Sequence, residues 1–176
     1  MEEFSLRLVA GQFVSLIALA LCILAFASKR DERLLALLIF ANVAFAVHFV
    51  LFESWVAASI TALIVLRIIL VRRFKGNWWV MTLMLAASLA AAILTWQRPL
   101  DALPLTAAVL GTVGMFILHG IPMRLFLAGA ALAWTLNNLM IGSIGGTLAE
   151  AIILVTNLIT IGRLARDRRC GSAVQD

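Results

Sequence analysis

Seven long apolar runs, separated by short polar or basic breaks, restrict the fold of this chain more than any other feature of its sequence. A helix that crosses the hydrocarbon layer of a bilayer, about 30 Å thick, needs about 20 mainly apolar residues. Hydrophobic residues occupy 64% of the 176 positions and charged residues only 13%, which excludes a water-soluble globule. The sequence predicts an all-α membrane protein with seven transmembrane helices. The predicted helices span residues 8–28, 34–52, 54–71, 77–97, 102–119, 123–142 and 146–164.

The basic residues fall almost entirely in the breaks that would lie on one side of the membrane. Lys and Arg in short loops stay on the cytoplasmic side, and this bias sets the orientation of the chain. Of the 14 basic residues, only Arg7 and Arg98 fall on the other side, which leaves 12 on the basic side. This distribution predicts a periplasmic N-terminus, a cytoplasmic C-terminus and a cytoplasmic tail over residues 167–176.

The breaks follow the same order twice along the chain. Residues 8–73 and residues 102–166 each contain three apolar runs, with a basic break after the first and a very short break after the second. A shift of about 90 residues brings residues 52–54 beside residues 142–144. Because three helices are an odd number, the linker run at 77–97 restores the orientation of the second unit. The sequence thus predicts two parallel three-helix repeats joined by a linker helix, a 3+1+3 arrangement.

The first repeat carries a resemblance to a known family of membrane proteins. The residues that carry it, between Gly11-Gln12 and Arg73, are Ser28-Lys29-Arg30, Asn42, Val47-His48-Phe49, Arg67 and Arg72-Arg73. Over residues 8–166 the chain resembles the bacterial inner-membrane YgjV-type family, and its layout resembles the wider SWEET, PQ-loop and MtN3 superfamily. The resemblance implies a seven-helix, SWEET-like protein of the bacterial inner membrane. The wider superfamily moves sugars or other small solutes, so the resemblance also implies transport of a small solute.

Two features depart from the pattern of that superfamily. PQ-loop proteins carry Pro-Gln near the inner end of the first helix of each repeat, and neither residues 25–28 nor residues 116–119 contain this dipeptide. SWEET proteins place an Asn in the third helix of each repeat. Asn157 matches that place in the second repeat, whereas the first repeat has Leu66 or Arg67 there.

Six side chains within the predicted helices are candidate solute-binding residues. Polar groups are costly in hydrocarbon and therefore tend to face the bundle interior or a wet cavity. Glu150 and Asn157 share one helix face, and Trp134 shares a face with Asn137 and Asn138 because these three stand at i, i+3 and i+4. A carboxylate beside amides offers acceptors and donors to a hydroxyl-rich or cationic ligand. The candidate set is Asn42, Trp134, Asn137, Asn138, Glu150 and Asn157.

Each of these residues also has a structural interpretation. The same polar faces can hold neighbouring helices together, at about 0.6 kcal/mol per hydrogen bond. His48 and Glu150 are candidates for proton coupling, since the pKa of histidine lies near neutrality, and the alternative for His48 is a core histidine with its hydrogen bonds satisfied. Arg67 is expected to extend along the third helix to the cytoplasmic interface, and the alternative is a role in gating.

Several function classes are excluded by the sequence. His48 and His119 fall near opposite membrane surfaces, so they are not expected to share a metal ion. No phosphate-binding loop, zinc-protease motif or nucleophile elbow is present, and no basic stripe indicates nucleic acid. We therefore expect no enzyme, cofactor or metal. The expected partners are the lipid bilayer and a small polar solute, with assembly into a homo-oligomer left open. The predicted function is small-solute transport, and the alternative is a non-transporting sensor, scaffold or assembly factor.

Overall fold

A computed structural model describes residues 2–27 and 31–172, and over these residues the chain is helical throughout apart from short turns. The helices are α1 (Glu2–Ala27), α2 (Asp31–Leu51), α3 (Trp55–Phe74), α4 (Trp78–Thr95), the short 3₁₀ turn η1 (Pro99–Asp101), α5 (Ala102–Ile117), α6 (Gly120–Met140) and α7 (Ile144–Ser172). All seven predicted helices are present, with most ends within a few residues of the prediction. The exceptions are α1, which begins earlier, and α7, which continues through much of the predicted tail. The predicted basic break at 28–30 and the last positions, 173–176, lie outside the described residues.

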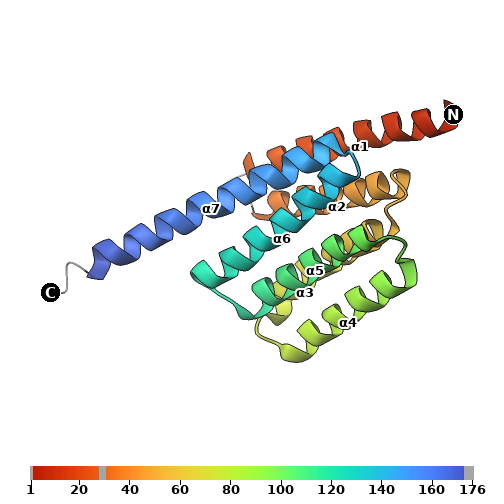
Figure 1. Cartoon of the computed structure of the whole chain (residues 1–176). Coiled ribbons are helices and arrows are strands. Elements are labelled where there is room, and N and C mark those ends of the chain that lie inside the picture. The colour runs from red at the N-terminus through yellow and green to blue at the C-terminus, as the bar shows by residue number, and fades with distance from the viewer. Residues whose placement is uncertain (1, 28–30, 173–176) are drawn as a thin grey trace.

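Six of the helices form a closed ring. Starting from α1, each packs against the next in the order α1, α2, α3, α5, α6, α7, and α7 returns to α1. The linker helix α4 packs against α3 and α5 at the edge of the bundle (Figure 1). Figure 1 also shows the start of α1 and the end of α7 projecting from opposite ends of the bundle. The ring encloses side chains from both halves of the chain.

Five of the seven helices are long and apolar enough to cross a membrane, by length and composition. They are α1, α3, α4, α5 with its preceding turn, and α7, with mean hydropathies from 1.7 to 2.5. The described side chains of α2 give a shorter apolar segment, Ala36–Leu51. Helix α6 lacks such a window because Arg124, Asn137 and Asn138 interrupt its apolar sequence. Two of the residues that lower its mean hydropathy, Asn137 and Asn138, are also candidate site residues.

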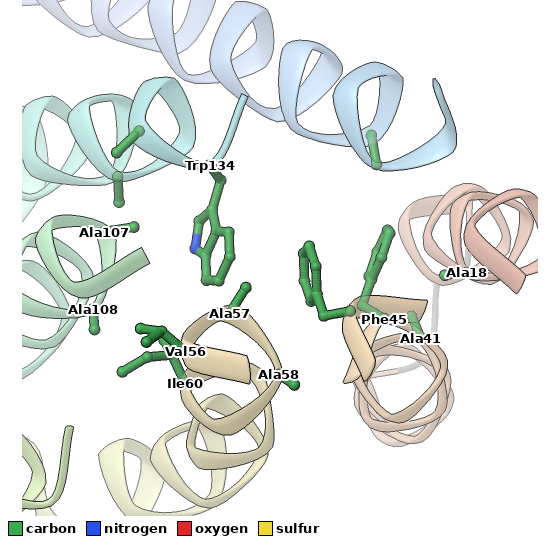
Figure 2. Close-up of a cluster of buried hydrophobic side chains, with 14 of the residues drawn as sticks. Ala18, Ala41, Phe45, Val56, Ala57, Ala58, Ile60, Ala107, Ala108 and Trp134 are labelled. Atoms are coloured by element: carbon green, nitrogen blue, oxygen red, sulfur yellow. The ribbon is translucent and has the colours of Figure 1, made fainter. Parts of the chain in front are cut away.

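The distribution of side-chain size explains how the helices pack. Small residues occupy buried positions of the ring, among them Ala57 and Ala58 on α3 and Ala107 and Ala108 on α5. Small residues let helix backbones approach closely where lipid supplies no hydrophobic drive between helices. Large apolar side chains instead cover the outside of the bundle, as expected for a surface in contact with lipid tails. Figure 2 shows the indole of Trp134 reaching from α6 into this small-residue interior, toward Ala57.

The two tight turns that join α2 to α3 and α6 to α7 have the same shape. Each contains one residue with a positive φ, Glu53 at 55° and Gly142 at 76°, followed by a buried serine, Ser54 or Ser143. Glycine adopts a positive φ at little cost, whereas an L side chain is strained there. The Glu53 carboxylate also forms an ion pair with Arg7, with 3.5 Å between nitrogen and oxygen.

Helix α4 begins at Asn77, and its amide oxygen accepts hydrogen bonds from the backbone N–H groups of Trp79 and Val80 at 3.0 and 3.2 Å. These bonds satisfy donors that the first turn of a helix leaves unpaired. We expect Asn77→Ala to lower the free energy of unfolding by about 1 kcal/mol. Asn77→Asp, which retains the acceptor, should leave it nearly unchanged. Thermal unfolding of the purified protein measures the difference, and equal losses in both variants would show that the cap contributes nothing.

Candidate functional site

A small polar cavity lies inside the ring, between α2, α3, α6 and α7. Its volume is about 20 Å³, which is room for about one water molecule. Four of the six predicted site residues line it together, Asn42, Trp134, Asn138 and Glu150, although they come from three helices. Thr61 of α3 completes the polar part of the lining. The structure therefore brings the majority of the predicted residues to a single place.

Two of the lining side chains are fully enclosed and have polar atoms without a hydrogen-bond partner. Thr61 is 2% exposed and Asn138 is 1% exposed, and neither Thr61 Oγ1 nor Asn138 Oδ1 forms a hydrogen bond with any described residue. A buried polar atom without a partner costs about 1–3 kcal/mol. Gly146 of α7 lies directly against the Asn138 amide, where a Cβ atom would collide with it. The amide is thus held close to α7, next to Glu150.

The hydroxyl group of Thr61 lacks the hydrogen bond that other threonines of the protein form. The hydroxyls of five threonines donate to the carbonyl oxygen four residues earlier in their own helix, at 2.6–2.8 Å. This local bond is the usual way for a threonine to satisfy its hydroxyl within a membrane helix. These five residues are Thr95, Thr135, Thr147, Thr156 and Thr160. Thr61 is more buried than any of them and makes no such bond.

Glu150 places a carboxyl group at the cavity, about two turns into α7. The side chain is half-buried, and it forms no hydrogen bond or ion pair with the residues whose side chains the structure describes. The charge of Arg67 on α3 attracts it through the bundle interior without a direct contact. An ionised carboxylate inside a membrane bundle is costly unless a partner neutralises it. The geometry thus leaves Glu150 with incomplete compensation.

Arg67 is buried, and the expectation that it extends to the membrane interface was wrong. Its side chain is 9% exposed and crosses from α3 to α5, where Nη1 lies 3.4 Å from the Ala108 carbonyl and 3.5 Å from Thr112 Oγ1. Gly111 makes this possible, because a Cβ atom there would stand 2.6 Å from Nη1. The guanidinium is therefore held on α5, while its Nε has no partner among the described residues.

Aromatic rings form the apolar wall of the cavity. The rings of Phe49 and Trp134 are stacked with centroids 5.5 Å apart, and Phe45 and Phe49 are stacked at 6.4 Å. In Figure 2 the nitrogen of the Trp134 indole is turned toward Ala107 and Ala108 of α5, away from Phe45. The cavity lining therefore combines aromatic carbon with polar side chains.

The remaining predicted site residues do not line the cavity. Asn137 is buried but its amide nitrogen has no partner among the described residues, and it faces another part of the interior. Asn157, further along α7, donates its amide to the carbonyl of Ile153 in its own helix at 3.0 Å. His48 is fully buried, with Nδ1 2.9 Å from the Gly11 carbonyl of α1, so this nitrogen donates the hydrogen bond.

A larger open cavity, about 290 Å³, lies at the end of the bundle that carries the α2–α3 and α6–α7 turns. Its polar lining includes Arg7, Glu53, Gln97 and Arg98. Phe52 lies on its floor, and the ring of His48 separates Phe52 from Phe49 of the central cavity, with centroids 4.5 and 5.0 Å away. We call this open cavity the vestibule. His48 thus contacts both a ring that lines the vestibule and a ring that lines the central cavity.

Sequence reasoning did not identify Thr61, Phe45 and Phe49 as part of the site. The sequence does distinguish Thr61, because it is a polar residue within an otherwise apolar run. The same feature identified Asn42 as a candidate. Nothing in the sequence distinguishes the two phenylalanines, because an apolar residue in a membrane helix can equally well face lipid, pack in the core or line a cavity. Only the packing of α2 against α6 distinguishes these possibilities.

Seven long helices with apolar outer surfaces, five of them suited to crossing a bilayer, define a polytopic helical membrane protein. The chain belongs to the YgjV family, described as a bacterial inner membrane protein, which it matches over residues 9–168. It is similar to the inner membrane protein YgjV of Escherichia coli (strain K12), with 26% identity over 161 residues that cover 92% of this chain and 87% of that protein. No solved structure matches the chain. The prediction of a YgjV-type inner-membrane protein is confirmed.

Proposed function

We propose that this protein is a transporter or facilitator of a small polar solute, with the central cavity as its solute site. The observation that carries the proposal is the convergence of Asn42, Trp134, Asn138 and Glu150, from three helices, on one small cavity. Helices that are merely held together satisfy their polar groups with each other. Here Thr61 and Asn138 retain oxygen atoms without a partner among the described residues. Asn137 and Arg67 also have polar atoms without a partner among the described residues, but only Thr61 and Asn138 combine this with a place in the cavity lining, where a solute would meet them.

The cavity as it stands is too small for a solute, and this suits a protein that alternates between conformations. A volume of about 20 Å³ holds one water molecule and no sugar-sized solute. The vestibule lies at one end of the bundle, and His48 contacts both Phe52 of the vestibule and Phe49 of the central cavity. Loading a solute from the vestibule therefore requires the helices to separate at these three rings. His48 and Glu150 remain our candidates for proton coupling, at the three rings and at the cavity.

The proposal includes the 3+1+3 arrangement of the SWEET and PQ-loop superfamily. Four backbone hydrogen bonds of the α2–α3 turn, within residues 48–58, recur in the α6–α7 turn within residues 137–147, each shifted by 89 positions. The contact of α1 with α7 and the contact of α3 with α5 exchange under the same shift. These observations support two equivalent three-helix units. Their register is one residue shorter than the shift of about 90 that the sequence suggested.

We further propose that all seven helices cross the membrane, with the N-terminus in the periplasm. This orientation places the vestibule, with Arg7 and Arg98, on the periplasmic side, and the basic ends of α3 and α7 on the cytoplasmic side. The proposed units are residues 8–73, the linker at 77–97 and residues 102–166. The alternative function, a non-transporting sensor or scaffold, has the same topology but requires no opening of the cavity.

A cysteine-accessibility experiment tests the proposal. In a chain with Cys22 and Cys170 replaced, Thr61→Cys places a thiol at the cavity, and Ala62→Cys places one on the exposed outer face of the same turn. We expect a membrane-impermeant maleimide to label the first variant in intact cells and in inverted vesicles, because the reagent reacts with thiols in water. The second variant should stay unlabelled in lipid.

The result that would overturn transport is equally specific. If Thr61→Cys stays unlabelled from both sides while Lys75→Cys, in the exposed turn before α4, labels in inverted vesicles, the cavity never opens and the scaffold function holds. Labelling of Thr61→Cys from one side alone contradicts alternating access as well. Equal labelling of Thr61→Cys and Ala62→Cys would show that the reagent reaches both faces without a cavity.

A further inference from the structure

The free polar groups of the central cavity match a particular class of ligand. Asn42 uses its amide nitrogen to bond the Leu38 carbonyl at 2.8 Å, so its remaining polar atom is an oxygen. Thr61 contributes a hydroxyl oxygen, and Glu150 contributes a carboxylate without a hydrogen bond or direct ion pair to any described side chain. The Asn138 amide adds an oxygen without a partner among the described residues, next to α7, and carries two N–H donors beside it. Oxygen atoms with one negative charge are the ligands of a hard cation.

The aromatic wall favours the same class. Phe45, Phe49 and Trp134 line the cavity together with the polar groups, and their rings stack as two pairs, Phe45 with Phe49 and Phe49 with Trp134. A cation is attracted to the face of an aromatic ring, and the attraction grows when water is excluded. The indole nitrogen, which would repel a cation as a donor, is turned toward α5 (Figure 2). An anion would meet a carboxylate and ring faces here, and both would oppose it.

The size of the cavity sets an upper limit on the ligand. About 20 Å³ accommodates a group as large as one water molecule. We propose that the central cavity binds a small monovalent cation, either Na⁺ or the ammonium head of a primary amine, with Glu150 as its counter-charge. This inference rests on the proposed function, because it assigns the ligand or the coupling ion of the same cavity. Thr61, Asn138 and Asn42 would supply neutral oxygen ligands.

The positive charge of Arg67 repels a cation in the central cavity and should therefore weaken its binding. The titratable groups that act on Glu150 from the packed helices are Arg67 and Cys22. Arg67 attracts the Glu150 carboxylate, but its bonds to Ala108 and Thr112 hold it on α5, so it does not occupy the cavity. Removing this positive charge should therefore strengthen cation binding rather than weaken it.

Cation binding can be measured on the full-length purified protein without knowing the transported solute. The unfolding temperature is recorded while N-methylglucamine chloride is replaced by NaCl, or in a second series by methylammonium chloride, at constant ionic strength and pH. A ligand at ten times its dissociation constant should raise the unfolding temperature by about 3–6 °C, in a saturable way. A response to Na⁺ alone identifies an inorganic ion site, and a response to methylammonium alone identifies an amine site.

Four variants separate a cation site from a structural role. Glu150→Gln should abolish the shift, and Thr61→Val should raise the half-saturating concentration several-fold. Thr135→Val is the matched control, because the Thr135 hydroxyl is already bonded to the Ala131 carbonyl and does not line the cavity. Arg67→Met should lower the half-saturating concentration several-fold. A residue that only holds the fold together would change the unfolding temperature in both salts equally.

The absence of a saturable shift with both cations would overturn the proposal, and so would an undiminished shift in Glu150→Gln. If Thr61→Val raises stability equally in every salt, the cavity holds a water molecule or nothing, which also overturns it. Should Glu150→Gln fail to fold, the contrast between Thr61→Val and Thr135→Val decides the result. These outcomes are independent of the maleimide labelling, so a cavity that opens to both sides without binding a cation refutes this inference alone.

Discussion

Arg67→Met should lower the free energy of unfolding by about 1–3 kcal/mol, because it removes both the positive charge that attracts the Glu150 carboxylate and the guanidinium contacts with Ala108 and Thr112. The side chain that replaces Arg67 is apolar and similar in length, so packing of α3 against α5 is largely kept. The loss reports the charge together with these two hydrogen bonds, and the stability regained when Glu150 is also neutralised reports the charge. The measurement is thermal or denaturant unfolding of the purified protein in a sodium-free buffer, with N-methylglucamine as the cation.

The double variant Arg67→Met with Glu150→Gln provides the control. Replacing both partners of a buried charged pair by neutral groups is often close to neutral in stability, whereas removing one partner is costly. We expect the double variant to regain most of the stability lost in Arg67→Met. If the two changes are additive instead, the two charges do not interact, and Glu150 does not depend on Arg67 as its counter-charge.

Gly145→Ala should also destabilise the protein strongly, by about 1–3 kcal/mol, which corresponds to several degrees in the unfolding temperature. Gly145 lies in the first turn of α7, where a Cβ atom would stand 2.5 Å from Ser15 Oγ and 2.7 Å from the Ser15 carbonyl oxygen of α1. A backbone atom cannot turn aside as a side chain can. The added methyl group must therefore push α1 and α7 apart.

The matched control for this prediction is Gly162→Ala, on the same helix. No atom lies within 4 Å of the position where its Cβ would be added. Alanine is a better helix former than glycine by about 1 kcal/mol, so this variant should be neutral or slightly more stable. The two substitutions are chemically identical and have opposite expected signs. Equal effects on the unfolding temperature would show that the close approach of α1 and α7 does not limit stability.

The helices were predictable from the sequence because a bilayer imposes a length and an apolar composition on each of them. The breaks at residues 72–77 and 97–104 consist largely of charges, glycine and proline, and the structure turns there as expected. The ends of α1 and α7 were not predictable, because a helix can continue through polar sequence beyond the membrane. The break between α2 and α3 is short, and its geometry depends on a positive φ at Glu53. Glutamate rarely adopts a positive φ, so the sequence did not predict this turn.

The site was predictable only as far as helix periodicity reaches. Spacing placed Trp134 and Asn138 on one face, and both line the cavity. The same argument placed Asn157 with Glu150, but Asn157 bonds the backbone of its own helix instead. Periodicity says which side chains share a face and nothing about how far the neighbouring helices extend along it. The prediction for the Arg67 side chain was wrong for a related reason, because the space that it occupies is created by Gly111 on another helix.

The closure of the ring by α1 and α7 has a consequence for the order in which the protein is made. Gln12 of α1 donates to the Gly142 carbonyl at 2.6 Å and accepts from the Ile144 backbone at 3.0 Å, so the first helix holds the start of α7, the last of the described helices. During synthesis, α1 to α6 are made before these partners exist. The cavity lacks Glu150 until then. A chain that ends before α7 therefore lacks both the contact that closes the ring and the carboxyl group of the cavity.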